Sequence, residues 1–298
     1  MHTISSSELL ALGCAFAWAL NGLILRSQLL KVSPPLINVV RCGMAGLFYW
    51  LLLPFDSAPL AALSQVTLGE WGLLLGNVVI GLVIADVLYL TSIREIGLSR
   101  TLALTGVFPL ATLLWEHLLL QQPLNPDLLL GSCLVVVGVI LLAGQVKAKS
   151  GAQEVGAERL KFGIFISLVA AVLWGLSTVL IKPAMAHMTA VQANAVRMPL
   201  VSLLPYLTRV WPNENENLAR LDWRTVGVLS LTGILGMGIG GLMFLAALKN
   251  LGPARAVTIT SVSPVFGLIF GVVFLKERLS VRIVAGVVFC VAGVWAVL

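Results

Sequence analysis

The sequence predicts an all-α integral membrane protein with ten transmembrane helices, arranged as two five-helix repeats of inverted topology. The first observation is composition: the 298-residue chain is 59% hydrophobic and only 11% charged, whereas soluble domains carry about 25% charged residues. So little charge cannot cover a surface that faces water, so most of the surface must face lipid. The second observation is an internal repeat, and the third is a series of apolar runs of spanning length.

The internal repeat extends over most of the chain. Asn38-Val39-Val40-Arg41 returns as Asn194-Ala195-Val196-Arg197. Further along, Gly81 returns as Gly236, Gly97 as Gly252, Arg100 as Arg255, Pro109 as Pro264, Gly131 as Gly286 and Gly138 as Gly293. One insertion or deletion between Arg197 and Gly236 reconciles the two offsets. Internal duplication in an apolar chain is typical of transporters built from repeats.

Ten runs are long enough to cross a bilayer, which requires roughly 20 mostly apolar residues. They are expected at about 8–27, 35–54, 70–93, 98–121, 127–146, 160–181, 190–211, 224–247, 254–275 and 281–298. Clusters of proline, glycine and serine mark several breaks between them. We therefore expect a first repeat over 1–146, a polar linker over 147–159 and a second repeat over 160–298.

The odd number of helices in each repeat predicts the inversion. The second repeat must enter the bilayer from the opposite side, so equivalent residues lie at mirrored depths around a pseudo-two-fold axis in the membrane plane. Two such halves can exchange conformations and open a shared central site to each side in turn. Most basic residues fall in the loops of one face, which the positive-inside rule makes cytoplasmic, with both termini outside. We expect a multi-pass protein of the cell (inner) membrane.

Cysteine and histidine usage argues against metal or catalytic chemistry. The cysteines are Cys14, Cys42, Cys133 and Cys290. Each lies in an apolar run and none forms a CxxC pair, so we expect packing residues without disulfides or a metal site. The histidines, His2, His117 and His187, have no useful spacing for an enzyme. Basic residues occur singly at segment ends, which does not fit nucleic-acid binding, and no cofactor is predicted.

The end of the second half resembles a known family pattern. The residues that carry the resemblance are Pro264, Glu277 within Leu275-Lys276-Glu277-Arg278-Leu279, Gly286 and Gly293, with Trp174 and Arg197 earlier in the repeat. The chain resembles a ten-helix member of the drug/metabolite transporter superfamily, with two EamA domains over nearly all of its length. The resemblance implies export or exchange of small metabolites, and relatives move amino acids, nucleotide sugars or drugs. The first repeat departs from the pattern, because Gln122 stands where Glu277 stands in the second.

Ionisable residues inside the apolar runs are the first candidates for the transport site, because each costs a few kcal/mol in the bilayer. Arg41 and Arg197 are expected to bind an anion or carboxylate from mirrored positions. The alternative is structural, with each arginine bonded to carbonyls or extended to an interface. Asp86 and Tyr89 share one helix face. The repeat equivalent of Asp86 is Gly241, so this carboxylate is predicted to serve the substrate or a coupling proton, or else to pair with arginine.

A second set of candidates combines aromatic, polar and acidic side chains. Trp18 and Trp174 are mirrored, and Asn21 and Ser177 follow each tryptophan on the same helix face, which suits amphipathic metabolites. Helix packing is the alternative for these four. Glu116 is a second candidate for proton coupling, and with His117 it could instead reach lipid headgroups. Asn77, Thr105 and Met237 are weaker candidates for the lining.

Two prolines are candidates for gating. Pro109 and Pro264 are equivalent, and each is expected to remove a helix hydrogen bond and produce a kink.

These residues predict a secondary transporter of a small polar or amphipathic metabolite, acting as a monomer or homodimer by alternating access. A lipid or drug flippase of the same fold is the main alternative. A membrane-embedded enzyme is the alternative from another class.

Overall fold

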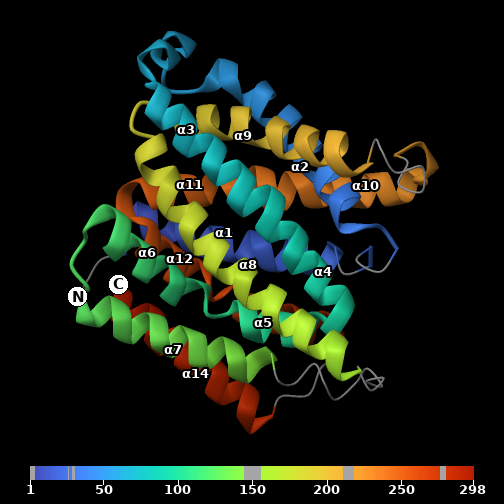
Figure 1. Ribbon diagram of the computed structural model, residues 1–298. Coiled ribbons are helices and arrows are strands. Elements are labelled where there is room, and N and C mark those ends of the chain that lie inside the picture. Colours follow the sequence, from blue (N-terminus) through green and yellow to red (C-terminus); the bar gives the residue numbers. More distant parts are fainter. Residues whose placement is uncertain (1–3, 26, 29–30, 144–155, 211–217, 276–279) are drawn as a thin grey trace.

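The computed structural model describes residues 4–25, 27–28, 31–143, 156–210, 218–275 and 280–298, and every secondary-structure element in these ranges is a helix (Figure 1). Most of the expected linker over 147–159 and the whole of 276–279, with Glu277, lie outside the described residues. The helices of the first half are α1 (Ser6–Leu25), α2 (Pro34–Leu52), α3 (Leu68–Asn77), the π-helix η3 (Val78–Ala85), α4 (Asp86–Ile96), α5 (Leu98–Thr105), α6 (Phe108–Leu120) and α7 (Pro126–Ala143).

The second half repeats this order of elements. Its helices are α8 (Ala157–Ala184), α9 (Ala190–Pro205), the π-helix η5 (Tyr206–Val210), α10 (Trp223–Thr232), the π-helix η7 (Gly233–Gly240), α11 (Gly241–Leu251), α12 (Pro253–Thr260), α13 (Ser263–Leu275) and α14 (Val281–Val297). Short 3-10 turns, η1 (Leu53–Phe55), η2 (Leu60–Gln65) and η6 (Leu218–Arg220), lie in the connections.

The helical membrane class is confirmed. Within the described residues, 8 helical segments are long and apolar enough to cross a membrane, and α14 is a shorter apolar helix. α9 and η5 together fill the region expected for the seventh span. The exact count of ten spans stays a prediction.

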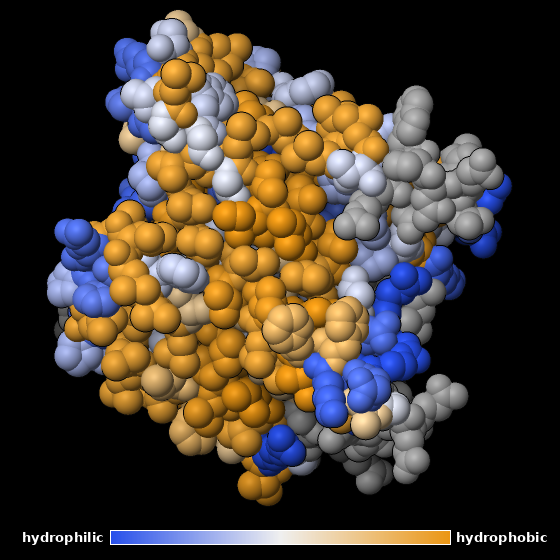
Figure 2. Space-filling view, in the orientation of Figure 1, coloured by the Kyte–Doolittle hydropathy of each residue, from blue (hydrophilic) through white to orange (hydrophobic). Residues whose placement is uncertain are grey.

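An apolar belt covers the face of the molecule in Figure 2, with hydrophilic residues gathered toward its left and right edges. Large apolar side chains are exposed on several helices: Leu51 is 74% exposed, Phe165 65% and Trp295 79%. Such a continuous apolar surface fits contact with lipid tails, in which each helix satisfies its own backbone hydrogen bonds.

The sequence repeat returns as a repeat of irregular backbone. The π-helices η3 and η7 begin at equivalent positions, Val78 and Gly233. The helices that follow them end at Gly97 and Gly252, which have positive φ angles of 84° and 89° that glycine adopts at little cost. In both halves a short turn then separates two helices, α5 from α6 and α12 from α13.

Contacts between α7 and α14, which lie side by side in Figure 1, reveal how the halves are related. Gly131 meets the carbonyl of Gly293, and Gly138 meets the carbonyl of Gly286, and both contacts are mutual. A Cβ atom on any of these glycines would lie 3.0 Å or less from the partner's carbonyl oxygen. Gly131 therefore contacts the repeat equivalent of Gly138, and Gly138 contacts the repeat equivalent of Gly131. The contacts run in opposite chain order along the two helices. Antiparallel helices related by a two-fold axis across them have this order, as inverted repeats require.

The contact between α2 and α9 has the same symmetry. Gly43 packs on Ser202, and Gly46 packs on Pro199. Pro199 is the repeat equivalent of Gly43, and Ser202 is the repeat equivalent of Gly46. Each glycine therefore contacts the residue that is equivalent to the other glycine. The inverted arrangement of the repeats is thus visible at two separate helix crossings.

Both described ends of the chain lie at the same end of the helix bundle (Figure 1). Arg255 Nη2 donates to Glu8 Oε1 at 2.7 Å and to the carbonyl of Leu298 at 2.8 Å. Arg26, Lys147, Lys149, Lys276 and Arg278, which contribute to the predicted charge bias, lie outside the described residues. The orientation with termini outside stays a prediction.

Candidate substrate site

Arg197 in α9 belongs to a hydrogen-bond network that joins several helices. Its Nε donates to Asn77 Oδ1 at 2.7 Å, and its Nη1 donates to Asn194 Oδ1 at 2.6 Å. Asn77 in turn donates to the hydroxyl of Ser177 at 2.7 Å, and Asn194 donates to the hydroxyl of Tyr49 at 2.8 Å. These side chains are buried, and the guanidinium is bonded to protein groups through both Nε and Nη1. The structural interpretation fits Arg197.

The network ends on the π-helix η7. The hydroxyl of Tyr49 lies 2.6 Å from the carbonyl oxygen of Gly238 and 3.0 Å from that of Met237, and donates to this pair. A π-helix departs from the regular α-helical hydrogen-bond pattern, and such segments are frequent at functional sites. The network therefore attaches the buried arginine to the irregular segment of its own repeat, through Tyr49 of the first repeat.

Arg41 has the equivalent position in α2 but a different environment. Its residue is 5% exposed, and its Nε is buried without a hydrogen-bond partner among the described residues. Thr232 stands where Asn77 stands in the other half, and its hydroxyl donates to a carbonyl of its own helix. Asn21, the equivalent of Ser177, is buried, and its Oδ1 also lacks a partner among the described residues. Arg41 and Asn21 thus retain hydrogen-bonding capacity.

Asp86 begins α4 directly after η3, and it is 8% exposed. Trp174 Nε1 donates to its Oδ1 at 2.8 Å, and Oδ2 accepts no hydrogen bond from the described residues. In the other repeat Gly241 replaces the aspartate, and Trp18 Nε1 instead donates to the carbonyl of Gly236 at 3.1 Å. The mirrored tryptophans are therefore held by a carboxylate in one half and by backbone in the other.

Aromatic rings surround the Trp174 indole. The ring of Tyr89 lies 5.0 Å from it and the ring of Phe108 lies 5.9 Å from it, between centroids. The three side chains come from α4, α6 and α8, and each is only partly buried. They form an aromatic wall, which the Trp174 indole joins to the carboxylate of Asp86.

The helices that carry Arg41 and Arg197, α2 and α9, pack against α4 and η3, which meet at Asp86. Among the described residues, no direct ion pair joins Asp86 to either arginine or to Arg94, whose residue is exposed. The expected alternative of a closed salt bridge at Asp86 is therefore not what the structure contains. Opposite charges lie in one buried region without contact.

Glu116 has a different set of contacts. Its Oε2 accepts the backbone N–H of Ala254 at 2.8 Å, near the start of α12, and its other oxygen faces Gly252. A carboxylate at a helix N-terminus is favoured by the helix dipole. His117 lies next to it and its Nδ1 is 2.8 Å from the carbonyl of Gln122, in an exposed position. The coupling role of Glu116 stays a prediction, and its visible role is to cap α12.

Pro109 and Pro264 lie at the starts of α6 and α13, each as the second residue of its helix. The missing N–H costs nothing at that position. The expected removal of an interior hydrogen bond is therefore wrong: the helix is interrupted just before each proline, after Thr105 and Thr260. The gating role of the two prolines stays a prediction.

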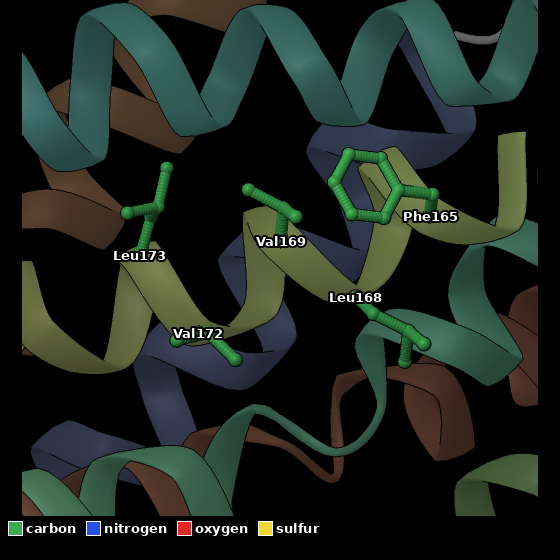
Figure 3. Close-up of a pocket in the computed structure, with 5 residues that line it drawn as sticks. All are labelled: Phe165, Leu168, Val169, Val172 and Leu173. Atoms are coloured by element: carbon green, nitrogen blue, oxygen red, sulfur yellow. The ribbon is translucent and has the colours of Figure 1, made fainter. Parts of the chain in front are cut away.

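The polar residues are distinct from the grooves on the molecular surface. One groove is lined by Phe165, Leu168, Val169, Val172 and Leu173 of α8, all apolar, as Figure 3 shows. Another is lined by Val287, Val288, Val291, Ala292 and Trp295 of α14. Because their linings are apolar, these grooves belong to the surface that faces lipid.

The sequence-based prediction missed Tyr49 and Asn194 as members of the polar network. Asn194 was visible as half of a repeated pair with Asn38, whose amide donates to the Leu82 carbonyl at 3.3 Å. Tyr49 lies in an apolar run, and its repeat equivalent is Pro205, so neither pattern nor symmetry indicated a polar role. No group of His, Cys, Asp and Glu that could hold a metal occurs among the residues searched, which are the described ones.

This fold and its buried polar groups define a multi-pass membrane protein built from inverted repeats. The chain belongs to the EamA-like transporter family, which matches residues 5–144 and 161–298. The family membership indicates a transporter, as the sequence resemblance implied.

Similar proteins are known from archaea and bacteria. An uncharacterized transporter of Archaeoglobus fulgidus is 28% identical over 94% of this chain and 93% of its own length. A probable amino-acid metabolite efflux pump of Salmonella typhimurium is 28% identical over 96% of this chain and 92% of its own length. One solved crystal structure has a TM-score of 0.78 at 16% identity, covering 99% of this chain and 98% of that one. At that identity the likeness shows the fold alone.

Proposed function

We propose that this protein is a secondary transporter, an exporter or exchanger, that moves a small polar or amphipathic metabolite such as an amino acid across the cell (inner) membrane. One observation carries the proposal: Arg41, Asn21 and Asp86 are buried, yet each keeps hydrogen-bonding atoms without a partner among the described residues. A buried charged group without a protein partner is costly. In a transporter the substrate supplies the missing partner.

The proposed mechanism is alternating access. The two inverted repeats exchange conformations, and the central site opens to one side and then to the other. Interrupted helices at α5–α6 and α12–α13 lie at equivalent positions, where each repeat can bend. Pro109 and Pro264 begin the second helix of each pair and are the proposed gates.

The substrate class is supported by one relative. The Salmonella typhimurium protein is named a probable amino-acid metabolite efflux pump, and it covers nearly the whole chain. An amino acid carries a carboxylate and an ammonium group, which suit Arg41 and Asp86. Trp18 and Trp174, with Tyr89, would contact the apolar part of the substrate.

Proton coupling is proposed at Asp86. This carboxylate has no equivalent in the second repeat, where Gly241 replaces it. A group that carries a proton across must exchange it with each side in turn, which a carboxylate in a shared site can do. Glu116 is the second candidate, although its bond to Ala254 gives it a capping role.

A drug or lipid exporter of the same fold is the second candidate function. The apolar grooves on α8 and α14 favour it, because an apolar substrate can move along them without meeting a polar group. Such a protein would transport lipid or drug probes equally well after substitution of Asp86 or Arg41.

The test is flux in proteoliposomes containing the full chain, over a panel of amino acids, other metabolites, drugs and fluorescent lipids. Arg41→Gln should abolish amino-acid flux, because it removes the buried cation. Lys161→Gln is the matched control, because the ion pair of Lys161 with Glu158 lies on the surface, where the Lys161 side chain is 78% exposed. Folded wild-type protein that moves no solute of the panel would contradict the proposal.

A further inference from the structure

We infer that the site is bipolar and selects zwitterions: Arg41 and Asn21 bind the anionic group of the substrate, while Asp86 and its aromatic wall bind the cationic group. The inference rests on the proposed function and deepens it. It assigns a separate role to each end of the site and excludes Arg197 from direct contact with the substrate.

The anionic end is defined by comparison of the two halves. Arg197 gives two hydrogen bonds to asparagines, at 2.7 and 2.6 Å, whereas Arg41 gives none to the described residues. Arginine binds carboxylates strongly and often through two parallel hydrogen bonds. Asn21 stands where Ser177 completes the Arg197 network, and its amide makes no hydrogen bond to the described residues. The Arg41 guanidinium and the Asn21 Nδ2 therefore donate no hydrogen bond to the described residues and are available to an anionic group.

The cationic end is defined by Asp86. Trp174 occupies Oδ1 and fixes the carboxylate, while Oδ2 remains free to accept a hydrogen bond. Tyr89 and Phe108 stand next to Trp174, with centroids 5.0 and 5.9 Å from its ring. The faces of aromatic rings attract cations, and the attraction grows when water is excluded. A carboxylate beside three rings suits an ammonium group.

Charge balance selects a ligand that has both groups. α2 packs against α4, and Val40 beside Arg41 and Tyr89 one turn from Asp86 pack against the same apolar cluster. Among the described residues, no direct ion pair joins Arg41 to Asp86. A ligand with one charge would satisfy one of them and leave the other buried without a close partner, which is unfavourable. A zwitterion satisfies both and adds no net charge to the membrane interior. The site should therefore reject simple amines and simple carboxylates.

The experiment measures binding to the purified full chain in detergent by isothermal titration calorimetry. The standard amino acids are screened first. The tightest binder is then compared with its carboxamide, which keeps only the cation, and with its N-acetyl derivative, which keeps only the anion. Each derivative loses the hydrogen bonds of one charged group, so wild-type protein should bind the amino acid at least about tenfold more tightly than either derivative.

Substitutions then assign each end. In Arg41→Gln the preference for the amino acid over its carboxamide should disappear, while the preference over the N-acetyl derivative remains. Asp86→Asn should do the reverse. Arg94→Gln is the control, because Arg94 is exposed and lies outside the site, and it should leave both preferences unchanged. Where Arg41→Gln or Asp86→Asn does not fold, Arg41→Lys and Asp86→Glu test the same ends, each by a partial loss of its own preference.

Several outcomes would overturn the inference. These are equal or better binding of a derivative by the wild type, the absence of binding by any amino acid, or an equal loss for all three ligands in both variants. Flux separates this failure from that of the proposed function. A protein that transports only amines or only carboxylates is still a transporter, but its site is not bipolar.

Discussion

Trp174 and Asp86 share a hydrogen bond of 2.8 Å that breaks the symmetry of the repeats. The equivalent Trp18 donates to the backbone of Gly236, because no side chain exists at Gly241 to reach it. A single replacement, aspartate for glycine, thus converts a packing tryptophan into one that orients a buried carboxylate. Positions that match between the repeats build the scaffold, and this unmatched position is where we propose that the substrate binds.

Trp174→Phe should lower both stability and transport, because it keeps the ring but removes the donor to Asp86. Loss of a hydrogen bond to a charged group costs about 1.5–3 kcal/mol, against about 0.5–1.5 kcal/mol for a neutral one. Trp18→Phe is the matched control and should cost less. Thermal unfolding and flux of both variants are the measurements, and equal costs would contradict the asymmetry.

Arg197→Gln should destabilise the protein more than Arg41→Gln. The first change removes two donors from Asn77 and Asn194 within a buried network, and unsatisfied buried groups cost about 1–3 kcal/mol each. Arg41 has no hydrogen bond to lose among the described residues, so its variant should fold with near-normal stability and fail in substrate binding. Denaturation curves together with binding isotherms separate the two effects, and matching stability losses would be evidence against this division.

Gly138→Ala should weaken the α7–α14 crossing. Its new Cβ would meet the carbonyl oxygen of Gly286 at 2.7 Å, and forced overpacking typically costs about 1–3 kcal/mol. Gly72→Ala is the control, because nothing lies within 4 Å of its Cβ position in α3. That control should keep or slightly raise the melting temperature, since alanine favours helices. An unchanged melting temperature in Gly138→Ala would argue against close backbone contact between α7 and α14.

Glu116→Gln and Asp86→Asn should differ in their effect on proton coupling. Because Glu116 caps α12 through Ala254, its replacement should lower stability by about 1 kcal/mol and leave pH-driven transport in place. Asp86→Asn should abolish pH-driven transport, and exchange of substrate for substrate should persist only at raised substrate concentration, because this variant binds the substrate more weakly. Uptake driven by an imposed pH gradient is the measurement. If Glu116→Gln loses pH-driven transport and Asp86→Asn keeps it, the coupling proton is carried by Glu116 and not by Asp86.

The sequence alone predicted the membrane class and the repeat, because long apolar runs and fixed spacings are properties of the chain itself. It also singled out Asp86 as an unmatched carboxylate. It did not separate Arg41 from Arg197, because their difference depends on Asn77 and Thr232, which come from other helices. Partners that meet only through tertiary packing leave no local pattern.

Backbone irregularity explains two further differences. Tyr49 has a polar role because η7 presents carbonyls to it, and no residue pattern at Tyr49 indicates a π-helix elsewhere. Pro109 and Pro264 were expected inside helices, whereas the interruption precedes them and they begin new helices. Proline is compatible with both positions, and the packing of the whole repeat decides between them.

The mutual glycine contacts between α7 and α14 also constrain how the protein is made. α7 ends at Ala143, whereas α14 begins only at Val281. A growing chain therefore inserts the two glycines of α7 long before the glycines of α14 that they contact have been synthesised. Until then Gly131 and Gly138 face lipid or another helix. The interface that closes the two halves is therefore completed late in synthesis, and neither repeat can finish its packing alone.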